Sequence, residues 1–332
     1  MAPMLGVRTL LMLTLGGFGA VFTALWGRDI ARKRTQGTRD RDAAAGDNSE
    51  AAAMRAGLPS LAQTSIGYVT NFFDTLGIGS YATTTSIYKL FRLVPDRLIP
   101  GTLLVGHMWP TVAQAVIYIH IVQVEMPTLV LLIAASVLGS WLGAGVVAGW
   151  PKRKIQIGMG FALLGAAGLM LASALHYLPG GGNTLGLDGW RMGAGLVGNF
   201  AFGALMNLGI GAYAPSLILF GFLGMDLKAV FPVMMGSCAF IMPTSGIRFI
   251  GRGSYSPRAA LGLAWGGVPA VLTAAYVVRE LKVDQLRWLV IGVAAYSALA
   301  LLHSAAKDRP RAQPVPPAQG VASAASQEFR RS

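Results

Sequence analysis

Long apolar stretches, separated by short polar connections, run through most of the chain. Six of them are near the ~20 residues that a helix needs to cross the hydrocarbon core of a bilayer. They are residues 98–121, 126–150, 155–178, 228–246, 259–278 and 288–303. The pattern predicts an all-α polytopic membrane protein.

The first apolar stretch, residues 9–26, comes before a cluster of basic residues. A secretory signal peptide has the opposite order, with its positive charges in front of a shorter apolar core. We therefore predict one extra N-terminal transmembrane helix that is retained in the protein. The polar, alanine-rich residues 27–57 that follow are predicted to be a cytoplasmic linker.

Two further apolar stretches, residues 58–93 and 192–223, are long for a single crossing and are interrupted near the middle by glycines. The interruptions share a heptad, which reads LGIGSYA from Leu76 and LGIGAYA from Leu208, at an offset of 132 residues. Three ordinary apolar stretches follow each copy. The chain is thus predicted to contain two repeats, each a glycine-broken helical hairpin plus three transmembrane helices.

Basic residues indicate how the repeats are oriented, because cytoplasmic loops are enriched in Lys and Arg. Such residues follow apolar stretches at 152–154, 248–258 and 307–311. If each hairpin enters and leaves the membrane on one face, each repeat crosses three times and the second copy is inverted. The alternative has both hairpin arms spanning, with four crossings and parallel copies. Residues 80–93 would form a helix of only ~21 Å, short for a ~30 Å core, which favours two inverted repeats.

This interpretation divides the chain into six parts and places it in a bacterial-type inner membrane, with the N-terminus outside and the C-terminus in the cytoplasm. In chain order they are the N-terminal transmembrane helix (1–26), the cytoplasmic linker (27–57), transmembrane repeat 1 (58–178), an external loop (179–190), transmembrane repeat 2 (191–304) and a disordered cytoplasmic tail (305–332).

Composition supports a membrane protein and narrows its chemistry. Only 12% of the residues are charged and 54% are hydrophobic, whereas roughly a quarter of the residues in soluble domains are charged. The basic residues behind the net charge of +13 lie in short connections, where topology requires them, so nucleic-acid binding is not expected. One cysteine and four scattered histidines provide no metal-ligand spacing, and we expect neither a metal nor a cofactor.

The two glycine breaks are the candidate substrate site. A helix that restarts after a glycine presents unpaired N–H groups and the positive end of its dipole, which favours an anion. Hydroxyl and amide side chains near the breaks add donors without a fixed charge. The candidate substrate-binding residues are Asn71, Thr75, Gly77, Gly79, Ser80, Tyr81, Thr83, Asn207, Gly209, Gly211, Tyr213 and Ser216. Close helix packing is the alternative explanation of the glycines, but their duplication favours a site.

Asp74 and His107 are the candidates for coupling transport to an ion such as the proton. An ionisable residue within a membrane segment indicates a function, but Asp74 has a second interpretation as a helix cap or a partner of nearby hydroxyls. His107 either carries a proton or is a packed structural histidine. Cys238 has no paired base or second thiol and is interpreted as a packing residue. Arg248 fits a cytoplasmic loop without a gating role.

The chain has the repeated broken hairpin, the proline-initiated helices that follow it and, starting at Gly209, the sequence GIGAYAPSLILFGFLGMDLKAVFPVMMGSCAFIMPTSG. In these features it resembles the sulfite exporter family of the TauE/SafE type. The resemblance covers about residues 58–302. It implies a permease for sulfite, thiosulfate, sulfonates or related organic anions, driven by an ion gradient. Many members have three glycines in a row where this chain has GIGSY, and residues 1–57 lie outside the common core.

The function expected from these features is that of a secondary transporter for a small anion, most simply a sulfur-containing one, working by alternating access. An anion channel and a transporter of a non-sulfur carboxylate are the alternatives. An enzyme is not expected, because the chain has no HExxH, GxSxG or paired-aspartate motif. The expected partners are the substrate, a coupling ion, the lipid bilayer and a second copy of the chain.

Overall fold

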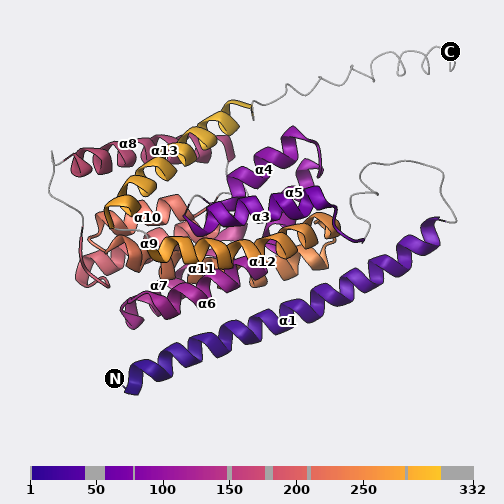
Figure 1. The fold of residues 1–332 in the computed structure, drawn as a ribbon, viewed down its shortest axis with the longest axis horizontal. Helices are drawn as coiled ribbons and strands as arrows, with labels where there is room; N and C mark the ends of the chain where they lie inside the picture. Colours follow the sequence, from indigo (N-terminus) through magenta and orange to yellow (C-terminus); the bar gives the residue numbers. More distant parts are fainter. Residues whose placement is uncertain are drawn as a thin grey trace, which may run out of the picture.

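The computed structural model describes residues 2–41, 57–77, 79–147, 152–175, 182–207, 211–280 and 283–307. Within these ranges every named element is a helix (Figure 1). The helices are α1 (Ala2–Arg41), α3 (Leu61–Thr75), α4 (Ser80–Leu90), η1 (Asp96–Leu98), α5 (Ile99–Gly106), α6 (Met108–Ile121), α7 (Met126–Val147), α8 (Lys152–Ala174), α9 (Gly189–Met206), α10 (Tyr213–Phe222), α11 (Leu227–Gly251), α12 (Pro257–Glu280) and α13 (Val283–Lys307).

The helices form a bundle around α11, most of whose side chains are buried. Helix α11 packs against α5, α6, α7 and α10. Helices α8 and α13 pair along one side of the bundle, and α1 runs along another side and extends beyond it (Figure 1). The prediction of an all-helical membrane-type fold is confirmed for the described residues.

The most extensive helix pairs join the two halves of the chain. Helix α3, the first arm of the first broken hairpin, packs on α12 from the second half, and α9, the first arm of the second hairpin, packs on α7 from the first half. Small residues allow these close contacts: a Cβ on Gly67 would lie 2.5 Å from the carbonyl oxygen of Gly262, and one on Gly203 would lie 2.0 Å from that of Ser136. Each hairpin is therefore held by the opposite half.

Both long apolar stretches are broken where the sequence predicts. Helix α3 ends at Thr75 and α4 begins at Ser80, while α9 ends at Met206 and α10 begins at Tyr213. Gly77 and Gly79 have φ angles of 94° and 82°, a left-handed region in which a residue with a Cβ is strained. The first break thus depends on glycine for its backbone conformation.

Two elements differ from the sequence expectation. Residues 98–121, expected as one span, form α5 and α6, which are bent by 42° at His107. Pro110 has no N–H to donate to the carbonyl of Gly106, so a continuous helix lacks that bond and a new helix starts instead. Helix α1 continues to Arg41, past the expected end near residue 26, and an Asp29–Lys33 ion pair at i,i+4 supports the added turns.

Among the described residues, three helices are long and apolar enough to cross a membrane, within Gly6–Thr35, Leu227–Gly251 and Pro257–Val277. The bent pair α5 and α6 adds a fourth span if it is counted as one. These spans agree with a multi-pass membrane protein.

Candidate functional site

The two helix breaks face each other in the core of the bundle. A Cβ placed on Gly79 would lie 4.0 Å from the Cβ of Tyr213, and one placed on Gly211 would lie 3.6 Å from the Cβ of Tyr81. Both tyrosines are buried, and they are equivalent positions in the duplicated heptad. The two contacts are therefore reciprocal: Gly79 of the first break lies against Tyr213 of the second, and Gly211 of the second lies against Tyr81 of the first.

Asp74 caps the helix that restarts after the first break. Its Oδ1 accepts a hydrogen bond from the backbone N–H of Ser80 at 2.5 Å, and its Oδ2 accepts one from Nε2 of Gln114 at 3.0 Å. The side chain is buried. A carboxylate at this position satisfies one of the free N–H groups of α4 and faces the positive end of its dipole. The capping interpretation of Asp74 thus has a direct structural basis.

Gln114 on α6 connects the two breaks. Besides its bond to Asp74, Nε2 donates to Oγ1 of Thr75 at 2.9 Å, and Oε1 accepts from the Tyr213 hydroxyl at 2.8 Å. One turn further along α6, the Tyr118 hydroxyl donates to the carbonyl oxygen of Thr75 at 3.2 Å. A single glutamine therefore ties the end of α3 to the start of α10.

Sequence reasoning missed Gln114 and Tyr118, although a signal for them was present. His107, Thr111, Gln114 and Tyr118 follow one another at spacings of four, three and four in an otherwise apolar stretch. This spacing places polar side chains on one face of a helix. That face of α6 is the one turned toward the breaks.

His107, at the bend between α5 and α6, is buried and has partners on both ring nitrogens. Nδ1 lies 2.9 Å from Oδ1 of Asn71, and Nε2 lies 3.3 Å from Oγ1 of Thr84. The Asn71 amide nitrogen donates to the carbonyl oxygen of Gly67 at 2.7 Å, which leaves Oδ1 as an acceptor. His107 Nδ1 is then the donor, and Nε2 accepts from the Thr84 hydroxyl, as expected for a neutral imidazole.

The second break is built differently. Met206 occupies the position equivalent to Asp74, and its sulfur lies 3.5 Å from Sγ of Cys238. The N-cap residue of α10, Ala212, provides no side-chain hydrogen bond. The start of α4 thus carries a built-in carboxylate, whereas the start of α10 does not.

On this side of the core, the buried hydroxyl of Tyr81 has no hydrogen-bond partner among the described residues. The Tyr81 ring stacks on that of His107 with the centroids 6.1 Å apart. A buried hydroxyl without a partner costs about 1–3 kcal/mol. Such groups mark a place where a polar ligand would find donors.

The structure brings most of the predicted site residues together, but not all. Those at or between the two breaks are Asn71, Asp74, Thr75, Gly77, Gly79, Ser80, Tyr81, His107, Gly211 and Tyr213. Thr83 bonds back to the carbonyl of Ser80. Ser216 is buried one turn into α10, and Gly209 lies outside the described residues.

Asn207 is turned away from the site into a different polar cluster. Its Nδ2 donates to the carbonyl oxygen and to Oγ of Ser140, at 3.0 Å each, and its Oδ1 accepts from Ser245 at 2.9 Å. These bonds join α9 to α7 and α11. Within the described residues, Asn207 therefore has the contacts of a helix-packing residue.

The fold and the meeting of the two breaks define a class: a multi-pass helical membrane protein built around a pair of broken hairpins. The model of the family described as "Sulfite exporter TauE/SafE" matches residues 64–301, and the chain belongs to this family. Membership implies a membrane transporter of sulfur-containing anions, not an enzyme. No similar curated protein and no similar solved structure was found.

Proposed function

We propose that the protein is a secondary transporter that moves a small sulfur-containing anion, such as sulfite, thiosulfate or an organosulfonate, across the cytoplasmic membrane by alternating access. The observation that carries the proposal is the reciprocal contact of Gly79 with Tyr213 and of Gly211 with Tyr81. Glycine-interrupted segments at corresponding positions of two repeats are the usual mark of a transporter binding site.

The pairing of the helices supports two repeats related by a two-fold axis. In the two repeats α3 corresponds to α9, α7 to α12 and α8 to α13. Exchanging the repeats therefore turns the α3–α12 pair into the α9–α7 pair and leaves the α8–α13 pair unchanged. Both relations hold in the structure, as they do in a two-fold arrangement. If the second copy is inverted and the basic connections are cytoplasmic, we expect the N-terminus outside and the C-terminus inside.

The asymmetry of the breaks indicates where the anion binds. Asp74 already accepts the N–H of Ser80 at the start of α4, so a second negative group is disfavoured there. The start of α10 has no capping side chain, and Tyr81, whose hydroxyl has no partner among the described residues, lies against Gly211 through its Cβ. We place the substrate at the α10 side, with Tyr81 as a donor.

Asp74 is the better of the two candidates for coupling. Its carboxylate lies between the breaks, where a bound anion would repel it, so protonation of Asp74 would favour anion binding. His107 has both ring nitrogens engaged with Asn71 and Thr84. We assign His107 to holding the first hairpin and Asp74 to carrying the proton.

The test replaces Gly79 or Gly211 by valine and measures uptake of sulfite and thiosulfate into proteoliposomes. Valine at Gly79 is strained by the positive φ, and at Gly211 its branches meet Tyr81. Gly193→Val is the matched control, because Gly193 lies on the exposed side of α9 with open space around its Cα.

We expect both site variants to reach the membrane in normal amounts and to lose transport, while the control keeps it. Trans-stimulated exchange of labelled substrate by the control protein separates a transporter from a channel. Normal transport by both site variants would refute the assignment of the site.

A further inference from the structure

Helix α1 is an addition to the transporter core. It ends at Arg41, whereas the family match begins at residue 64. Even so, α1 is firmly part of the structure, because it contacts α6, α7 and α11 along one side of the bundle (Figure 1).

One face of α1 is shaped to fit α11 and α6. Leu15, Phe22 and Trp26 are buried on it, at helical spacing. The Phe22 ring fills the space beside Gly246 of α11, where a Cβ would lie 2.9 Å from it, and Phe18 packs edge-on against Phe240 with the ring centroids 5.9 Å apart. This is knob-and-groove packing of the kind that small residues permit between membrane helices.

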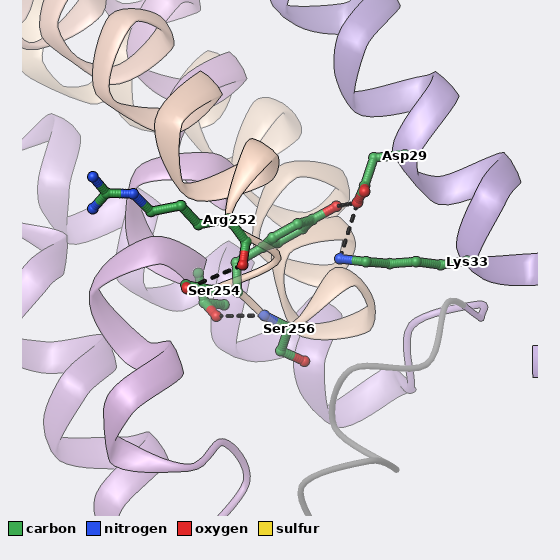
Figure 2. Close-up of polar contacts among 7 residues, drawn as sticks. Asp29, Lys33, Arg252, Ser254 and Ser256 are labelled. Atoms are coloured by element: carbon green, nitrogen blue, oxygen red, sulfur yellow. Dashed lines mark hydrogen bonds and ion pairs between the residues drawn. The ribbon is translucent and has the colours of Figure 1, made fainter. Parts of the chain in front are cut away.

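Polar contacts among Asp29, Lys33 and Tyr255, here called the clasp, join the far end of α1 to the bundle (Figure 2). The hydroxyl of Tyr255, in the connection between α11 and α12, donates to Oδ2 of Asp29 at 2.5 Å. Lys33 pairs with the same carboxylate oxygen at 3.0 Å and lies 4.2 Å above the centre of the Tyr255 ring. Tyr255 is fully buried. Two interactions thus bind α1 to this one connection, the hydrogen bond to Asp29 and the stacking of Lys33 on the Tyr255 ring, and the ion pair within α1 holds the two side chains together.

The clasped connection is itself fixed to α5. The backbone N–H of Ser256 donates to Oγ1 of Thr102 at 2.9 Å, as Figure 2 shows for Ser256. A Cβ on Gly101 would lie 2.1 Å from the carbonyl oxygen of Ser254. Helix α5 leads directly to the bend at His107, which contacts the first hairpin through Asn71 and Thr84.

We propose that α1 is a built-in latch. It docks along α11 and is closed by the bond between Asp29 and Tyr255. In this position it holds the connection between α11 and α12 against α5. It thereby restrains the opening of a path from this end of the molecule to the two helix breaks. The latch is a property beyond the proposed transport function. It rests on that function in one respect: the opening that it restrains is the one through which the substrate would pass.

Cys238 provides a reporter that needs no transport assay. It is the single cysteine of the chain, it is buried and free, and it lies on α11 beside Met206 at the second break. A maleimide reaches it only when the core opens. The rate of labelling in native membranes by membrane-permeant N-ethylmaleimide therefore measures how often the core is open.

The clasp variant is Tyr255→Phe, which removes the hydroxyl bond and keeps the ring that Lys33 covers. We expect Cys238 to label about tenfold faster, the factor that follows from losing one hydrogen bond to a charged group in the closed state. Tyr276→Phe is the control, because Tyr276 lies on α12 with 71% of its surface exposed; its labelling rate should equal that of the wild type.

A second reporter separates opening of the latch from general loss of stability. In a chain that carries Cys238→Ala and Ala298→Cys, the reporter thiol lies buried on α13, on the opposite side of the bundle (Figure 1). Tyr255→Phe should leave the labelling of this position slow. Equal acceleration at both positions would mean unfolding rather than a latch, and an unchanged rate at Cys238 would also overturn the proposal. Neither result depends on whether the glycine variants transport.

Discussion

Replacing Gln114 by leucine tests whether the contact between the breaks is held by polar bonds. Leucine has nearly the volume of glutamine, so the packing of α6 is largely preserved. The change removes the bonds to Asp74, Thr75 and Tyr213 in a region that excludes water. The variant therefore probes the three hydrogen bonds rather than the space that the side chain fills.

The magnitude follows from the groups left behind. The buried Asp74 carboxylate loses a charge-assisted bond, worth about 1.5–3 kcal/mol, and the Tyr213 hydroxyl loses its bond to Gln114, worth about 0.5–1.5 kcal/mol. Thr75 keeps a partner, because its hydroxyl also donates to the carbonyl of Asn71 at 2.8 Å. We expect the free energy of unfolding to fall by about 2–4.5 kcal/mol.

The assay is reversible unfolding of the purified protein in mixed micelles, followed by tryptophan fluorescence. Gln123→Leu is the matched control, because Gln123 is exposed in the connection between α6 and α7, and its change should stay within about 0.5 kcal/mol. In the double variant with Tyr213→Phe the two losses should add to less than their sum, because they share one bond. A loss below about 1 kcal/mol for Gln114→Leu would refute the reasoning.

Three further predictions follow from single groups. Asp74→Asn removes the charge but keeps an acceptor for Ser80, so transport should persist and lose its pH dependence, as measured by uptake across pH 5–8. Phe22→Ala empties the space beside Gly246 and should lower stability by about 3–5 kcal/mol in the same unfolding assay. Burial and the bond to Asp29 raise the pKa of Tyr255, so its stabilisation is present below the unfolded pKa of about 10 and is lost at higher pH. Thermal midpoints between pH 9 and 11 should therefore fall more for the wild type than for Tyr255→Phe.

The sequence by itself determined the membrane class, the duplication and the location of both breaks. These features depend on local properties: apolar length sets a span, and glycine readily adopts the positive φ that ends a helix, as at Gly77 and Gly79. The family resemblance rested on local sequence motifs of the same kind, and it is confirmed by the match over residues 64–301. The types of side chain near the breaks could also be read directly from the sequence around the heptad.

Only the tertiary structure decided which of these side chains share a site. Asn207 and Thr75 are equivalent in the repeat, yet Asn207 bonds Ser140 and Ser245 while Thr75 bonds Gln114. The bond from Tyr255 to Asp29 spans 226 positions of the chain. Such contacts depend on how whole helices pack and on which donor finds an acceptor across the bundle. Periodicity along one segment contains no information about the partner that a distant segment places opposite it.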